Sequence, residues 1–154
     1  MKDKNFIKVI KCIKEQIRNA QHKAILNANK EMIILYWNIG KVIIENGTWG
    51  SKFLKKLSLE IINEFPSSKG FSVRNLNNMA RFYREYPEFE IVQTASAQIT
   101  WSHNLEIFRL KSKVQRLWYI NKTIENGWSV NVLAHQIDTN LYARQIEQKK
   151  ISNF

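Results

Sequence analysis

The chain has 154 residues, of which 44% are hydrophobic and 24% are charged. A chain of this length and composition buries enough apolar surface to fold as one domain without disulfides or a structural metal. It carries 24 lysine and arginine residues against 13 acidic residues, so its formal net charge is +11 and its isoelectric point is about 9.8. Such an excess is typical of nucleic-acid-binding proteins, although a lysine-rich solvated surface also produces it.

The sequence lacks the usual features of exported and membrane proteins. Cys12 is the single cysteine, so an internal disulfide is excluded. The first residues do not resemble a signal peptide, and no apolar run approaches the about 20 residues that span a bilayer. We therefore expect a cytoplasmic protein without a membrane partner.

The N-terminal segment, residues 5–46, has the apolar spacing of a helix, with steps of three and four residues. Its apolar positions include Ile10, Ile13, Ile17, Leu35, Ile39 and Val42. No proline interrupts the segment, so it predicts either one long helix or a helical hairpin that bends near residues 27–29. This segment is also the candidate contact of a homodimer.

Turn and capping residues divide the rest of the chain into further helices. Gly47 and Ser51 predict the end of the first helix and the N-cap of a second, which Pro66 ends. Ser72 predicts the N-cap of a third helix that extends to Tyr86. The same reasoning predicts later helices over residues 102–111, 112–126 and 129–148, with capping residues Ser102, Ser112 and Ser129 and a turn at Gly127.

Residues 88–101 are the least helical stretch, because 91–100 are rich in β-forming side chains and predict a short strand or a wing-like loop. The tryptophans at the helix corners, Trp37, Trp49, Trp118 and Trp128, are expected to fill the core. Together these elements predict an all-α, single domain over residues 1–154, with a helix-turn-helix-like core that carries or lacks a wing.

The helix over residues 72–86 has two chemically distinct faces. Its apolar face is formed by Val73, Leu76, Met79, Ala80, Phe82, Tyr83 and Tyr86, and its polar face by Arg74, Asn77, Asn78, Arg81, Arg84 and Glu85, with Asn75 at the border. Arginine and asparagine match the guanine and adenine edges of the major groove. We therefore predict that Arg74, Asn75, Asn77, Asn78, Arg81 and Arg84 contact nucleic acid. Nearby lysines would meet phosphates, namely Lys52, Lys55, Lys56 and Lys69.

No pattern of catalytic or metal-binding residues stands out. His22, His103 and His135 are far apart in the sequence, and neither a phosphate-binding glycine loop nor a nucleophile elbow is present. Glu147-Gln148-Lys149 matches the Glu-x-Lys of metal-dependent nucleases, but it lies in a helical tail. In the cluster 101–104, Ser102 is expected to cap a helix while Trp101 and His103 fill the corner. The residues thus predict no enzyme, no cofactor and no metal.

Several short segments, spread in order over about residues 30 to 148, match a known family. They are Tyr36-Trp37-Asn38-Ile39-Gly40-Lys41, Trp49-Gly50, Glu64-Phe65-Pro66, Lys69-Gly70-Phe71-Ser72, Arg74-Asn75-Leu76, Tyr86-Pro87, Trp101-Ser102-His103-Asn104-Leu105, Trp118-Tyr119, Glu125-Asn126-Gly127-Trp128-Ser129 and Leu141-Tyr142-Ala143-Arg144-Gln145. In these segments the chain resembles the N-terminal helical domain of YhcG-like bacterial proteins.

The resemblance implies a winged-helix-like, DNA-binding module that works with a C-terminal PD-(D/E)XK nuclease domain, often in restriction or defence systems. The nuclease motif itself is not found in this sequence, so we expect the nuclease domain to be absent from the chain. The leading hypothesis is a recognition module for double-stranded DNA. The alternatives are a protein-protein interaction or dimerisation module whose basic face is only solvated, and RNA binding, which lacks an aromatic strand motif here.

Overall fold

The computed structural model describes residues 2–46 and 50–152, and these residues form eight α-helices and one short 3-10 helix without a strand. In order they are α1 (Lys2–Glu45), α2 (Ser51–Glu64), α3 (Val73–Glu85), α4 (Phe89–Thr94), η1 (Ser96–Gln98), α5 (Trp101–Ile107), α6 (Lys113–Asn126), α7 (Val130–Asp138) and α8 (Leu141–Ser152). The prediction of an all-α fold is confirmed. The predictions for Gly47 and Trp49 lie outside the described residues.

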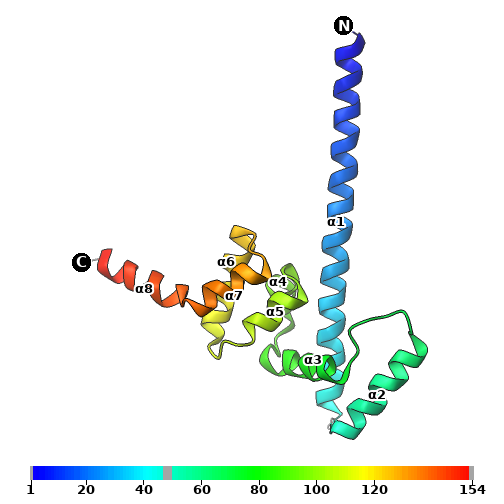
Figure 1. Ribbon diagram of the computed structural model, residues 1–154, viewed down its shortest axis with the longest axis vertical. Coiled ribbons are helices and arrows are strands. Elements are labelled where there is room, and N and C mark those ends of the chain that lie inside the picture. Colours follow the sequence, from blue (N-terminus) through cyan, green and yellow to red (C-terminus); the bar gives the residue numbers. More distant parts are fainter. Residues whose placement is uncertain (1, 47–49, 153–154) are drawn as a thin grey trace.

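The helix α1 is one continuous helix, so the alternative of a hairpin is wrong. Asn29, at the expected bend, donates from its side-chain amide to the carbonyls of Ile99, at 2.9 Å, and Ala97, at 3.4 Å. The amide of Asn29 therefore holds α1 against residues 97–99, and the helix continues through this position. Figure 1 shows the N-terminal part of α1 projecting away from every other helix, and residues 4–28 are exposed throughout.

The main core lies where α1 crosses α3. Gly40 makes the crossing close, because a Cβ atom at this position would lie 2.0 Å from the carbonyl oxygen of Met79. Beside it, the indole of Trp37 donates a 2.7 Å hydrogen bond to the carbonyl of Tyr86 at the end of α3. The side chains that surround these contacts are fully or nearly buried, among them Ile33, Tyr36, Ile43, Leu76, Phe82 and Val92.

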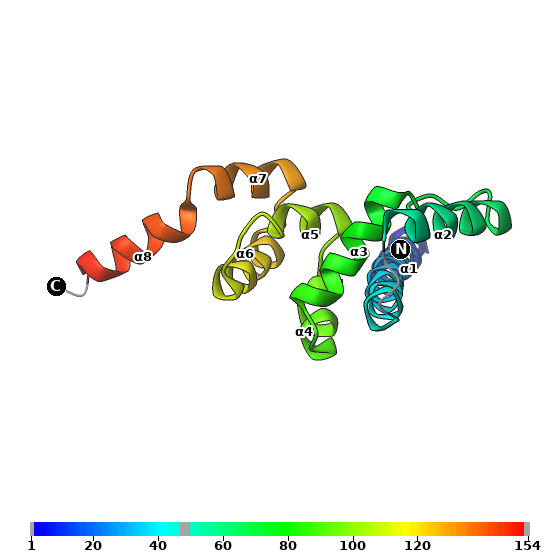
Figure 2. The same ribbon diagram turned by 90° about the horizontal axis from the view of Figure 1, so that it is seen from below.

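A second core joins α5, α6 and α7. Ile107, Tyr119, Ile120 and Leu133 are buried within it. The hydroxyl of Tyr119 accepts a hydrogen bond of 3.1 Å from the backbone N–H of Tyr142, which fixes the start of α8. Figure 2 shows the helices following one another across the molecule, from α2 at one end to α8 at the other.

Residues 89–94 form α4 and residues 96–98 form η1, so the predicted strand or wing is wrong for this segment. Val92 is buried in the main core, and Ala95 and Ile99 are buried in the second core. Local hydrogen bonds satisfy the backbone, for example from the N–H of Ala95 to the carbonyl of Ile91 at 2.9 Å. Because no second strand is available among the described residues, local pairing outweighs the β-propensity of the side chains.

Several helix ends also differ from the predictions. Thr100, not Ser102, caps α5, and Gly50 precedes α2 where Ser51 was expected to act as the cap. The predicted helix over residues 129–148 is broken into α7 and α8, because Asn140 adopts a left-handed conformation with φ of 54°. In contrast, Ser72, Ser112 and Ser129 cap their helices as predicted, and Gly127 ends α6 in a left-handed conformation.

Candidate nucleic-acid interface

The two faces predicted for the helix over residues 72–86 are those of α3. Its N-cap, Ser72, accepts from the backbone N–H of Asn75 at 3.1 Å. Leu76, Met79, Ala80 and Phe82 are buried against the core. Four polar residues at steps of three and four lie exposed along the opposite side of the helix, namely Arg74, Asn77, Arg81 and Arg84. We call this row the α3 polar line.

Asn75 does not belong to the α3 polar line, because its side chain is engaged within the protein. Its amide nitrogen donates a 2.6 Å hydrogen bond to the carbonyl of Gly70, and its oxygen accepts a 2.8 Å bond from the indole of Trp101. The first bond ties the loop before α3 to that helix, and the second ties α5 to it. Asn75 therefore positions α3 rather than presenting a free amide to a ligand.

Arg81 lies on the α3 polar line, but its side chain contacts other residues of the protein. Its guanidinium donates a 2.6 Å hydrogen bond to the carbonyl of Phe108, stacks over the ring of that residue, and approaches Glu85 at 3.7 Å. Glu85 also pairs with Arg116, which is 2% exposed, at 2.7 Å. The hydrogen bond from Arg116 is the main cause that lowers the pKa of Glu85, with charge from Arg116 and Arg81 adding to it.

The rest of the polar face is open to solvent in varying degrees. Arg74 and Asn77 are exposed, and neither has a hydrogen-bond or ion-pair partner among the residues that the structure covers. Asn78 is half-buried at the edge of the line, and Arg84 is exposed at its C-terminal end. Arg74 and Asn77 are therefore exposed and, among the described residues, not engaged with other side chains as Arg81 is.

The four predicted phosphate-binding lysines are all exposed, but they do not share one surface. Lys69 lies in the loop that the Asn75–Gly70 bond ties to the first turn of α3, close to Arg74 in the chain. The other three are on α2, which buries Leu54 and Ser58. By helical spacing, Lys52 and Lys56 lie on the side of α2 opposite to this buried side, and Lys55 lies between the two sides.

The cluster Trp101–Asn104 fills a corner, as predicted, but with a different cap. Nδ1 of His103 lies 2.6 Å from the hydroxyl of Thr100, and Nε2 lies 2.8 Å from the carbonyl of Trp128. Since a carbonyl only accepts, Nε2 carries the proton and Nδ1 accepts from the hydroxyl. Both ring nitrogens are thus used within the fold. His22 and His135 are exposed on α1 and α7, far from this corner in the sequence.

The fold and its exposed α3 polar line define a basic, all-helical domain. Residues 12–144 match the family described as the DUF1016 N-terminal domain, and the chain belongs to this family. A relative from Escherichia coli (strain K12), named "Putative nuclease YhcG", is 25% identical over 166 aligned residues. This match covers 84% of the chain and 44% of the relative, so the chain spans less than half of the relative's length. No solved structure matches.

These comparisons confirm the resemblance to the YhcG-like family and correct one prediction. The prediction that the protein is not an enzyme is wrong, because the relative whose match covers 84% of the chain is named "Putative nuclease YhcG". The relative extends well beyond the part that matches this chain. Within the described residues, no helix is both long enough and apolar enough to cross a membrane.

Proposed function

We propose that this domain is the nucleic-acid-binding module of a nuclease-related protein, and that it binds double-stranded DNA through the α3 polar line. The observation that carries the proposal is the exposed pair Arg74 and Asn77 on a helix that is rigidly held from its other side. Arginine and asparagine side chains on a helix held in place suit the bidentate contacts that read guanine and adenine. The net charge of +11 supplies the attraction to phosphates.

In this proposal the residues of the α3 polar line have separate roles. Arg74 and Asn77 contact base edges, with Asn78 beside them, and Arg84 contacts the backbone. Arg81 and Asn75 hold the helix in place through their bonds to Phe108 and Trp101. Lys69 meets a phosphate next to the first turn of α3, and Lys52, Lys55 and Lys56 extend the positive field along α2.

The helices α2 and α3 would act as a helix-turn-helix-like pair with α3 as the recognition helix. The loop between them, residues 65–72, is longer than the usual three or four residues. It is held from both sides, since the hydroxyl of Ser58 on α2 donates a 2.6 Å bond to the carbonyl of Phe71 and Asn75 on α3 bonds Gly70. A long but fixed loop still gives the two helices one relative orientation.

The relative's name supports a place in a nuclease system, and we propose that the domain brings DNA to nuclease chemistry. Fluorescence anisotropy with a labelled mixed-sequence duplex, at about 50 and 200 mM salt, tests the binding step. We expect binding that weakens steeply with salt, and a loss of about tenfold or more in Arg74→Ala/Asn77→Ala. The control Lys150→Ala removes one positive charge from α8, far from α3 in Figure 2, and should change the affinity little.

Two outcomes of this experiment would contradict the proposal. If the wild-type protein binds no duplex at low salt, the positive net charge only keeps the surface solvated and does not attract DNA. If the double variant binds as tightly as Lys150→Ala, the α3 polar line is not the contact. A single-stranded RNA of the same sequence, bound more tightly than the duplex, would favour RNA as the ligand.

A second candidate function, self-association, is favoured by α1. Residues 4–28 of this helix are exposed along their whole length, and large apolar side chains are among them. An amphipathic helix of this length without a packed face is usually completed by another helix. We propose that α1 mediates dimerisation, which would also place two DNA-binding domains in one assembly.

A further inference from the structure

The helix α1 carries one apolar row along nearly its whole length. Its members share one side of the helix and follow at steps of three or four residues, apart from one step of seven between Ala28 and Leu35 that passes Glu31. They are Phe6, Ile10, Ile13, Ile17, Ala20, Ala24, Ala28, Leu35, Ile39 and Val42, and we call them the α1 seam. Phe6 is 66% exposed, Ile17 is 52% exposed and Val42 is 61% exposed. The seam lies away from the buried side of α1, which holds Ile33 and Gly40.

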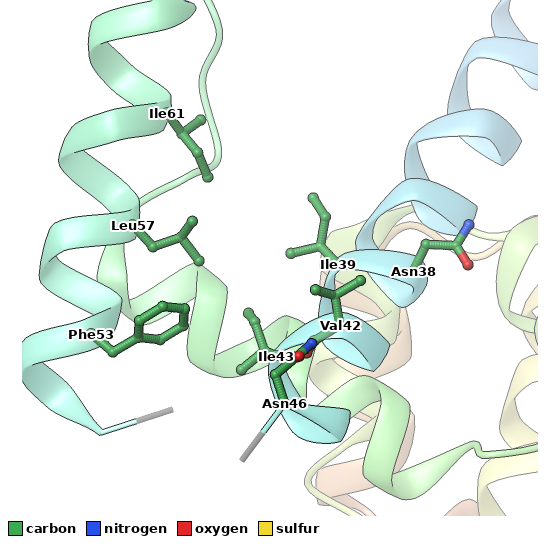
Figure 3. A pocket seen from close by; sticks show the side chains of 8 residues that line it. All are labelled: Asn38, Ile39, Val42, Ile43, Asn46, Phe53, Leu57 and Ile61. Carbon is green, nitrogen blue, oxygen red and sulfur yellow. The ribbon is translucent and has the colours of Figure 1, made fainter. Parts of the chain in front are cut away.

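The C-terminal end of the α1 seam forms one wall of an open apolar groove. The groove lies between α1 and α2 and has a volume of about 540 Å³. Figure 3 shows Ile39, Val42 and Ile43 on α1 facing Phe53, Leu57 and Ile61 on α2 across it. Asn38 and Asn46 at the α1 side are its polar members. The seam and the groove are therefore one continuous apolar surface.

The charges on α1 favour one orientation for a second copy. Residues 4–28 hold six lysine and arginine side chains and one glutamate, whereas residues 29–46 hold two basic and two acidic side chains. Two parallel copies would place the basic halves side by side, and like charges repel. Two antiparallel copies place each basic half against the neutral half that contains Glu31 and Glu45. The charge pattern thus selects the antiparallel pair.

The sizes of the seam residues fit the same arrangement. Small residues occupy its middle, at Ala20, Ala24 and Ala28, where two helices that cross near a two-fold axis come closest. Phe6 and Val42 are equally far from Ala24 along the sequence, which is about 27 Å of helix in each direction. With the axis near Ala24, the large side chains at the N-terminal end reach the groove at the C-terminal end of the other copy.

We propose that two copies of this chain pair through antiparallel α1 helices, and that Phe6 and Ile10 of each copy occupy the groove between α1 and α2 of the other. This inference rests on the self-association proposed above and not on DNA binding. In this pairing the N-terminal end of the other copy's α1 fills the groove, so dimerisation depends on where α2 lies relative to α1. The helix α2 in turn precedes the loop that leads to α3.

Sedimentation of the full chain over a range of concentrations tests the pairing. We expect a dimer for the wild type and a monomer for Ile17→Glu, which places a charge in the seam. The matched control is Leu26→Glu. Leu26 is 50% exposed, like Ile17 at 52%, but it lies on the opposite side of α1, about two and a half turns further on. This control should remain dimeric.

Disulfide cross-linking tests the orientation. In a Cys12→Ser background, the protein carrying Ile10→Cys and Asn38→Cys is oxidised, and its linked peptides are identified by mass spectrometry. We expect links between position 10 of one copy and position 38 of the other. Within one copy these positions are about 42 Å apart on a straight helix, so such a link joins two molecules.

The outcomes separate this inference from the proposals on which it rests. A dimer with links only between identical positions, 10 with 10 and 38 with 38, overturns the antiparallel pairing but leaves self-association standing. A wild-type protein that remains monomeric at every concentration overturns both. A dimer that Ile17→Glu and Leu26→Glu weaken equally, or not at all, shows that the seam is not the contact. None of these results bears on the affinity for a duplex.

Discussion

The indole Nε1 of Trp101 donates a 2.8 Å hydrogen bond to the side-chain oxygen of Asn75, so the first turn of α5 is joined directly to the first turn of α3. The amide nitrogen of the same asparagine is bonded to Gly70 in the preceding loop. One half-buried side chain therefore connects the loop, α3 and α5. Its neighbour Asn77, two positions further on, extends into solvent on the α3 polar line.

Replacing Asn75 should therefore reduce stability, whereas replacing Asn77 should not. In Asn75→Ala the indole N–H of Trp101 and the carbonyl of Gly70 lose their partners, which costs about 1–3 kcal/mol. In Asn77→Ala no internal bond is lost, and alanine favours the helix. Urea unfolding followed by circular dichroism measures both changes. Equal stabilities of the two variants would show that the Asn75 bonds do not hold the fold.

The close crossing of α1 and α3 predicts a strong effect at Gly40. In Gly40→Ala the new methyl group would lie 2.0 Å from the carbonyl oxygen of Met79, so the helices must separate. We expect a loss of about 1–3 kcal/mol in unfolding free energy, as for other overpacked cores. Gly50→Ala is the control, because nothing lies within 4 Å of a Cβ atom there. A Gly40→Ala variant as stable as Gly50→Ala would contradict the observed crossing.

The pair of Glu85 and Arg116 predicts part of the acid sensitivity of the fold. Folding lowers the pKa of Glu85, chiefly through the hydrogen bond from Arg116. The ionised pair therefore adds stability above the ordinary glutamate pKa, and this contribution is lost as the pH falls through the lowered value. In Glu85→Gln, the unfolding free energy should be smaller near neutral pH and should decrease less between about pH 5 and pH 3.

Urea titrations at several pH values measure this dependence, with Glu60→Gln as the control. Glu60 is an exposed glutamate of α2 without a salt bridge among the described residues. The control should keep the pH profile of the wild type. An unchanged profile in Glu85→Gln would mean that the pair with Arg116 contributes no pH-dependent stability.

Replacing Arg81 should lower the stability of the fold, whereas replacing Arg74 should weaken duplex binding, although both residues lie on the α3 polar line. Arg81→Ala removes the hydrogen bond to the carbonyl of Phe108 and should lower the unfolding free energy by about 1–2 kcal/mol. This value is in the lower part of the range for charged hydrogen bonds, because the Arg81 side chain is partly exposed. Arg74→Ala should leave stability within about 0.5 kcal/mol and weaken duplex binding. Thermal unfolding and anisotropy on the same samples distinguish the two. The assignment of roles fails if Arg74→Ala unfolds more easily than Arg81→Ala.

Much of the fold is predictable from local sequence signals. The N-caps at Ser72, Ser112 and Ser129 and the turn at Gly127 are confirmed, because a cap depends on residues only a few positions apart. The two faces of α3 are also confirmed, since a strict helical period separates its apolar and polar residues. The groove between α1 and α2 was missed. Its signal is present in the apolar spacing of residues 35–43 and 53–61, but the sequence does not show that these two segments face each other.

The sequence by itself determined that the chain is helical and basic, and that α3 presents arginine and asparagine opposite an apolar face. Only the tertiary structure decided which of these polar side chains remain available to a ligand. The sequence places Arg74, Asn77 and Arg81 on one polar face with Asn75 at its border, and it predicts nucleic-acid contact for all four. Their roles differ because Trp101 and the carbonyl of Phe108, both distant along the chain, fold against Asn75 and Arg81. Hydrogen-bond partners that packing brings together from distant segments leave no local pattern in the sequence.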